Sequence, residues 1–161
     1  MAHVHRYRSH LVWEGSTAAG YRSYGREHRL VTPPSTVQFR LSSDPAFRGD
    51  PALPNPEQLL LASASSCQLL SFLAGAARAG IDVLAYDDEA EAVMPEDEAP
   101  VRITRIVLRP QIVVAAGTDI DRVRSLVAEA HESCYVANTL NAEMVLEPVI
   151  EAASASRTSS R

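Results

Sequence analysis

The first part of the chain alternates hydrophobic and polar positions in short runs separated by turn residues. Residues 37–41 show a period of two, which predicts a β-strand with one buried face. Counting this one, three short strands are expected, at residues 11–13, 21–31 and 37–41. A loop containing three prolines follows at residues 42–54.

A long uncharged segment then predicts a helix. Asn55 can cap its start, Pro56 suits the first helical position, and Gly80 ends the helix after about Ala79. Apolar residues cover more than one stripe of this helix, so we expect it to be buried nearly all round. Ser and Gln interrupt the run too often for a solitary membrane span. In a small domain such a helix is either wrapped by sheet or shared with a partner chain.

The pattern after residue 80 predicts strands again, followed by a second helix. The expected elements are strands at 81–93 and 101–114, a helix at 119–137 and a closing strand at 143–150. The polar tail at 151–161 is predicted to be disordered. The order of elements predicts one α+β domain over residues 1–150, built on antiparallel sheet.

Charge and composition exclude several classes of function. The formal net charge of −5 leaves no basic field to hold nucleic acid or an anionic membrane. The 15 basic residues are all Arg, so Schiff-base chemistry and a lysine general base are excluded. Seven acidic residues between Asp87 and Glu98 are interpreted as a solvated hairpin rather than an ion site. The first 13 residues lack the apolar core of a signal peptide, which predicts a cytoplasmic protein.

The two cysteines, Cys67 and Cys134, are the candidates for chemistry. Cys67 falls in the middle of the long helix, where it is either a small buried hydrophobe or a thiol activated by a neighbour. It lies too far from the helix start to use the dipole, so an activating cation would be Arg or His. Cys134 falls near the end of the second helix with His131 three residues before it, on the same face. Two ligands do not make a metal site, so no metal is expected.

Two motifs resemble the OsmC/Ohr family of thiol-dependent peroxidases. The first is Asn55-Pro56-Glu57-Gln58-Leu59-Leu60, followed ten residues after the Glu by the cysteine of Ser65-Ser66-Cys67. The second is the segment at residues 130–140, AHESCYVANTL, which carries Cys134. The resemblance runs from about Val12 to Glu147, with the same order of elements.

The resemblance implies an intertwined homodimer in which two sheets wrap long central helices. It assigns Cys67 as the peroxidatic thiol, which attacks a hydroperoxide and becomes a sulfenic acid, and Cys134 as the thiol that resolves it as a disulfide. Glu57 matches the active-site carboxylate and Arg48 the active-site Arg, with Arg40 as a second candidate. The expected substrates are organic hydroperoxides and hydrogen peroxide. An external dithiol such as dihydrolipoamide is the expected reductant, and no bound cofactor is implied.

Helix geometry adds one inference about assembly. Glu57 and Cys67 are ten positions apart, about 15 Å along one helix, so they cannot meet within one chain's straight helix. If Glu57 serves Cys67, the partner chain supplies it, which predicts two equivalent sites at a dimer interface.

Two alternatives to the enzyme remain open. One is an OsmC-like stress-associated binding protein with little turnover, and the other is a static Cys67–Cys134 disulfide. The family frequently has Pro directly after the resolving cysteine, where this chain has Tyr135.

Overall fold

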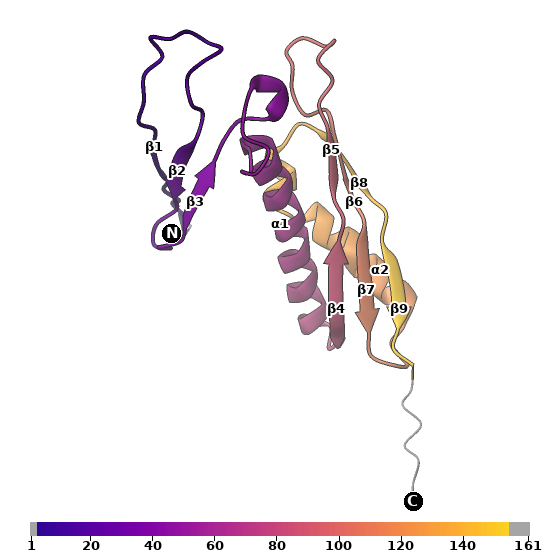
Figure 1. The fold of residues 1–161 in the computed structure, drawn as a ribbon. Helices are drawn as coiled ribbons and strands as arrows, with labels where there is room; N and C mark the ends of the chain where they lie inside the picture. Colours follow the sequence, from indigo (N-terminus) through magenta and orange to yellow (C-terminus); the bar gives the residue numbers. More distant parts are fainter. Residues whose placement is uncertain (1–2, 155–161) are drawn as a thin grey trace, which may run out of the picture. The chain divides into compact units, whose positions relative to one another are not determined.

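The computed structural model describes residues 3–154 and divides into two compact units, Met1–Leu60 and Leu61–Arg161. The division falls in the first turns of helix α1 (Pro56–Arg78) (Figure 1). The prediction of one domain over residues 1–150 stays a prediction. The predicted boundary at residue 151 is wrong, because the last strand includes Glu151 and Ala152. Residues 155–161 lie outside the described part of the chain.

The first unit contains a three-stranded antiparallel sheet in the order β1-β2-β3. Its strands are β1 (His10–Val12), β2 (His28–Val31) and β3 (Gln38–Leu41). The second strand is shorter than the predicted 21–31, because Arg26 holds the preceding segment in a turn. Its guanidinium donates to the carbonyls of Tyr21 (2.8 Å) and Tyr24 (2.9 Å) and stacks on both rings.

The predicted buried face of β3 forms only at the end of the strand. Leu41 is buried, whereas Phe39 and the preceding Val37 are exposed. A three-stranded sheet of such short strands has too few apolar side chains to bury every position on one of its faces.

Helix α1 begins and ends where the sequence predicts. Asn55 and Gln58 form a reciprocal cap, in which the Gln58 N–H donates to Asn55 Oδ1 (2.8 Å) and the Asn55 N–H donates to Gln58 Oε1 (3.0 Å). Gly80 takes a left-handed conformation (φ 70°) just past the last turn, which a residue with a Cβ adopts only under strain.

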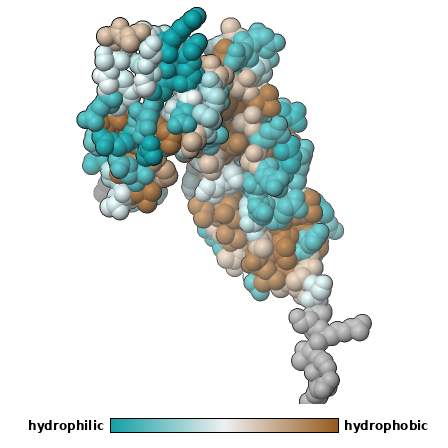
Figure 2. Space-filling view, in the orientation of Figure 1, coloured by the Kyte–Doolittle hydropathy of each residue, from teal (hydrophilic) through white to brown (hydrophobic). Residues whose placement is uncertain are grey.

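The burial of α1 differs from the prediction. A single stripe is buried within the chain: Ala64, Gln68, Phe72 and Ala76. Leu70 on another face is 63% exposed and Leu73 is 37% exposed, so the expected burial on nearly all sides is wrong for the chain by itself. By length and apolar composition alone α1 could also cross a membrane, a test that core helices of soluble proteins pass too. Figure 2 shows hydrophobic residues gathered over the lower part of the second unit, where Figure 1 draws α1 and β4 (Val83–Asp88).

The second unit contains two small sheets in which each predicted long strand is divided in two. After β4 the strands are β5 (Glu91–Val93), β6 (Arg105–Leu108), β7 (Pro110–Val114), β8 (Glu143–Leu146) and β9 (Val149–Ala152). The orders are β4-β7-β9 and β5-β6-β8.

Pairing within these sheets is mixed, so the prediction of an antiparallel sheet holds only in part. β4 with β7 and β5 with β6 are antiparallel, as in a long hairpin. β6 with β8 and β7 with β9 are parallel. Parallel neighbours need a long connection, and helix α2 (Ile120–Glu132) provides it between β7 and β8.

The point at which the strands divide is held by Arg109. Its backbone N–H donates to Asp88 Oδ1 (2.7 Å), and its guanidinium pairs with Glu91 (3.1 Å) and Glu147 (2.9 Å). Acidic residues of the predicted solvated hairpin therefore join neighbouring strands through one arginine.

Both helices pack on the sheet through one hydrophobic core. Its buried members are Phe72, Ala76, Ile112, Val114, Val123, Leu126, Val127 and Ala130. Ser65 of α1 donates a hydrogen bond to Asp88 of β4, and Gln68 Nε2 donates to the Val127 carbonyl of α2 (3.0 Å). These contacts set where the middle of α1 lies in the unit. The chain thus has a mixed α+β fold.

Candidate active site

The structure brings Cys67 and Cys134 into contact. Cys67 is partly buried on α1, and Cys134 is buried just after α2. The two side chains share a hydrogen bond, and both thiols are free.

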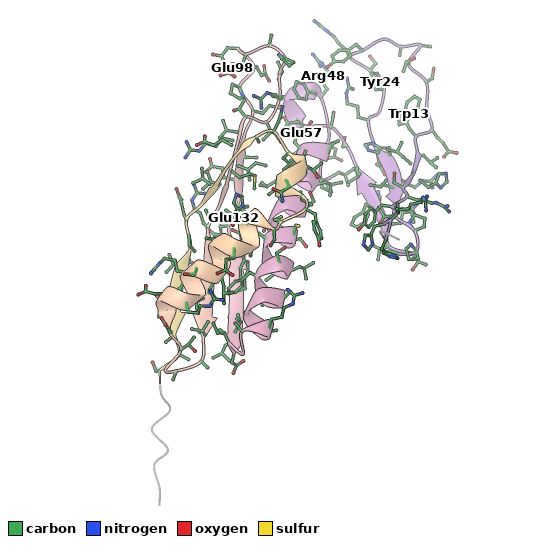
Figure 3. All side chains as sticks on the ribbon, turned by 180° about the vertical axis from the view of Figure 1, so that it is seen from behind. Trp13, Tyr24, Arg48, Glu57, Glu98 and Glu132 are labelled. Carbon is green, nitrogen blue, oxygen red and sulfur yellow. The ribbon has the colours of Figure 1, made fainter. Side chains whose placement is uncertain are left out.

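Cys134 lies in a turn rather than in the helix that the sequence predicts through residue 137. α2 ends at Glu132, whose carbonyl accepts a hydrogen bond from Asn138 Nδ2 (2.9 Å) (Figure 3). The Cys134 N–H donates to the His131 carbonyl (3.1 Å), and the Cys134 carbonyl accepts from the Asn138 N–H (3.0 Å). These bonds replace the missing helical turn and fix the chain around Cys134.

Hydrogen bonds stabilise the thiolate form of Cys67. Burial opposes them as the largest single influence, because it disfavours the charged form. The neighbouring Cys134 thiol, followed by the Val136 backbone, the Ser71 hydroxyl and the Tyr135 backbone, outweighs this and lowers the pKa of Cys67. Each of these donors is neutral.

Cys134 is in the opposite situation. Burial, followed by the bond to Cys67, raises its pKa, although the N–H groups of Ala137 and Val136 partly offset this. The Ala137 N–H lies 3.5 Å from Cys134 Sγ. The pair therefore favours a Cys67 thiolate that accepts a hydrogen bond from a protonated Cys134.

His131 is not a partner for either thiol through its ring. It contacts Cys134 through its backbone carbonyl, and its buried Nδ1 has no hydrogen-bond partner in the described part of the chain. Among residues 3–154 no group of three His, Cys, Asp or Glu side chains is placed to hold a metal ion.

The other predicted site residues lie in the first unit. Arg48 is exposed and follows the short 3₁₀ helix η1 (Pro45–Phe47) in a left-handed conformation (φ 68°). Glu57 is half-buried in the first turn of α1 (Figure 3). Within residues 3–60 the two side chains form no ion pair with each other. Arg40 instead pairs with Glu27 (2.7 Å), with both side chains largely exposed. The active-site roles of Arg48, Glu57 and Arg40 stay predictions.

The groups that lower the pKa of Cys67 were missed by sequence reasoning. Ser71 could have been found, because it lies four positions after Cys67 and so on the same face of the helix. The Tyr135 and Val136 donors are backbone groups, which carry no residue-type signal.

A separate cavity of about 390 Å³ lies in the first unit. Trp13 and Tyr24 line it, together with Arg26 and His28 (Figure 3). Both Nη atoms of Arg26 already donate to backbone carbonyls. The cavity is thus mainly an aromatic surface feature of the β1–β2 connection.

Comparison with known proteins places the chain in a family. Residues 49–148 match the family model of OsmC-like proteins. The uncharacterized protein YmaD of Bacillus subtilis is 24% identical over 102 residues, which are 60% of this chain and 68% of YmaD.

Solved structures share the fold. An OsmC-like protein of unknown function from Vibrio cholerae has a TM-score of 0.82 at 24% identity, covering 91% of this chain and all of that one (100%). An organic hydroperoxide resistance protein from Elizabethkingia anophelis has a TM-score of 0.70 at 16% identity, covering 95% of this chain and 100% of that one. With the family model matching well over half of its length, the chain belongs to the OsmC-like family.

Proposed function

We propose that the protein is a cysteine-based peroxidase that reduces organic hydroperoxides, and hydrogen peroxide as a second substrate. The observation that carries the proposal is the contact between Cys67 and Cys134. The pKa of Cys67 is lowered, which favours its thiolate, whereas the pKa of Cys134 is raised, which favours its protonated thiol. Peroxide reduction needs such a pair, because the thiolate is the nucleophile and a second thiol must resolve the product. Related structures carry the name organic hydroperoxide resistance protein, which agrees with this chemistry.

The proposed reaction has three steps. The Cys67 thiolate attacks the outer peroxide oxygen, the O–O bond breaks, and the leaving alkoxide takes a proton to become an alcohol. Cys134 then attacks the sulfur of the Cys67 sulfenic acid, which forms the disulfide and releases water. An external dithiol such as dihydrolipoamide reduces the disulfide to two thiols and is itself oxidised to a disulfide.

Arg48 and Glu57 are proposed to act from a second copy of the chain. An Arg would stabilise the leaving oxygen, and a carboxylate would orient the guanidinium. The spacing of Glu57 and Cys67 on α1 is the reason for assigning them to different chains. The exposed Leu70 and Leu73 on α1 support a homodimer, because a second copy would cover apolar surface that the chain leaves open. We place the protein in the cytoplasm, where both thiols stay reduced between turnovers.

A peroxide-consumption assay tests the function. Wild type is mixed with tert-butyl or cumene hydroperoxide and dithiothreitol or dihydrolipoamide, and peroxide loss is followed with time. Cys67→Ser is expected to abolish turnover. Activity of Cys67→Ser equal to wild type would refute the enzyme. If wild type itself consumed no peroxide with either dithiol, a stress-associated binding role would replace the proposal.

A further inference from the structure

Arg48 is held in a backbone conformation that an arginine rarely adopts. Its φ of 68° lies in the left-handed region, and such a conformation persists only where neighbouring contacts enforce it. Both peptide groups that flank Arg48 are bonded within the loop. In the first, the Arg48 N–H donates to the Pro45 carbonyl (2.9 Å), and the carbonyl accepts from Ser43 Oγ (3.2 Å). In the second, the Gly49 N–H donates to the Asp44 carbonyl (3.0 Å). The backbone therefore fixes the direction in which the Arg48 side chain leaves the loop.

Asp44 joins this loop to the start of α1. Its carboxylate accepts two hydrogen bonds, from the Ala46 N–H to Oδ1 (2.8 Å) and from Asn55 Nδ2 to Oδ2 (3.3 Å). Asn55 is 4% exposed, and its own Oδ1 is already occupied in the cap of the helix. Glu57 lies in the same first turn (Figure 3). One carboxylate thus couples the backbone that carries Arg48 to the helical turn that carries Glu57.

We propose that Asp44 is a positioning residue for peroxide reduction, which places the Arg48 guanidinium against the leaving oxygen of the hydroperoxide. The inference rests on the peroxidase function proposed above, in which Arg48 stabilises that oxygen. While the S–O bond forms and the O–O bond breaks, the electron pair of the O–O bond goes to the leaving oxygen. This oxygen carries negative charge until it takes a proton, and a donor stabilises it best when it is already in place.

The backbone has this task because no side-chain contact performs it within the chain. Among residues 3–60 the ion pairs join Arg29 to Glu14 and Arg40 to Glu27, and none ties Arg48 to a carboxylate. The starting position of the Arg48 guanidinium therefore depends on the loop and on what holds the loop to α1.

The test compares two peroxides whose leaving groups differ in basicity. Reduced protein is mixed with tert-butyl hydroperoxide or peracetic acid without reductant, and the loss of thiols is followed with time. tert-Butoxide is a strong base that needs the guanidinium, whereas acetate is a weak base that leaves without help. A merely structural role of Asp44 would slow both reactions equally, because it would reduce the amount of competent protein.

Asp44→Asn should slow the reaction with tert-butyl hydroperoxide about fivefold and the reaction with peracetic acid less than about twofold. In this variant the amide nitrogen faces either Asn55 Nδ2 or the Ala46 N–H, so one of the two bonds is lost. If circular dichroism shows that Asp44→Asn does not fold, Asp44→Ser takes its place. Its hydroxyl still caps the Ala46 N–H but is too short to reach Asn55, and the same difference between peroxides is expected.

Three further variants test the route through Arg48. The exchange Asp44→Asn with Asn55→Asp reverses the bond between the two positions, and it should restore the rate with tert-butyl hydroperoxide to within about twofold of wild type. In an Arg48→Ala background, Asp44→Asn should cause no further loss, since it acts only through Arg48. Asp50→Asn removes a charge from the same loop but keeps the acceptor for the Ala52 N–H, and it should match wild type.

Equal slowing with both peroxides in Asp44→Asn, no recovery in the exchanged pair, or a further loss in the Arg48→Ala background overturns the inference. Wild-type thiols that survive tert-butyl hydroperoxide would overturn the peroxidase function itself, and the inference with it. Wild type that reacts with this peroxide beside an equally fast Asp44→Asn would overturn the positioning role alone.

Discussion

The middle of α1 and the turn after α2 present two different kinds of backbone to a cysteine. Around Cys67 the helix uses its N–H groups in its own hydrogen bonds, so it gives the thiol a firm position but no free backbone donor. Around Cys134 the helix has ended, and the N–H groups of the turn are free to bond sulfur. The pKa of Cys67 on the regular element is lowered in part by groups that the irregular element supplies. In the proposed peroxidase, these groups are what would distinguish a reactive thiol from a buried hydrophobe at Cys67.

The largest expected effect comes from removing the thiol of the turn. One equivalent of hydroperoxide without reductant should consume both free thiols of wild type. In Cys134→Ser it should consume one and leave a sulfenic acid on Cys67, because no second thiol can attack it. Thiol titration and mass spectrometry after dimedone treatment measure the difference. Cys67→Ser, as the control, should give no dimedone adduct, and absence of the adduct in Cys134→Ser would remove the resolving role.

The next effect concerns the contact that holds the two regions together. Gln68 is 1% exposed and donates to the Val127 carbonyl (3.0 Å). Gln68→Ala should lower the free energy of unfolding by about 2 kcal/mol, through the lost bond and the cavity left behind. Gln68→Leu should cost less, because it fills the space and also removes Oε1, which has no partner among residues 3–154.

Urea denaturation of both Gln68 variants measures this difference. The exposed Gln111 on β7 offers a matched control, and Gln111→Ala should stay within about 0.5 kcal/mol of wild type. Equal losses for Gln68→Ala and Gln111→Ala would mean that the bond to α2 contributes nothing.

The pH dependence of the two thiols gives a third test. The pKa of Cys67 is lowered and that of Cys134 is raised. As the pH is increased, Cys67 should therefore ionise and become reactive before Cys134 does. At neutral pH iodoacetamide should modify Cys67 at least about tenfold faster. The ratio should shrink at alkaline pH, once Cys134 also ionises. Peptide mapping over the pH series measures it, and a Cys134 profile that rises first would reverse the assignment of thiolate and donor.

Sequence patterns located α1 closely because its signals are local. Asn55 caps it, Pro56 starts it and Gly80 ends it, and each acts through its own backbone geometry. The extent of its burial could not be predicted as well, since burial depends on what covers each face. The parallel pairing of β8 and β9 was missed for a similar reason, because period-two alternation predicts a strand but not the direction of its neighbour.

The part of the candidate site that depends on residue type could be predicted from the sequence. Cys67 and Cys134 could be selected from their motifs, and the structure brings them into contact. The expectation that an activating cation for Cys67 would be Arg or His stays a prediction, and the groups that lower the pKa of Cys67 in the structure are neutral. The early end of α2 at Glu132 decides whether residues 135–137 have free N–H groups. Helix ends are set by small differences in local energy, so the motif alone did not reveal these donors.

The smallest expected effect belongs to the one side-chain donor that α1 itself provides. The Ser71 hydroxyl, one turn after Cys67, helps to lower the pKa of the Cys67 thiol, so Ser71→Ala should slow Cys67 alkylation at neutral pH about threefold. Ser66→Ala is the matched control, since Ser66 lies exposed on the same helix beside Cys67 and the same atom is deleted. Site-resolved alkylation rates of the two variants decide the matter. Equal alkylation rates in the two variants would mean that the Ser71 hydroxyl does not stabilise the Cys67 thiolate.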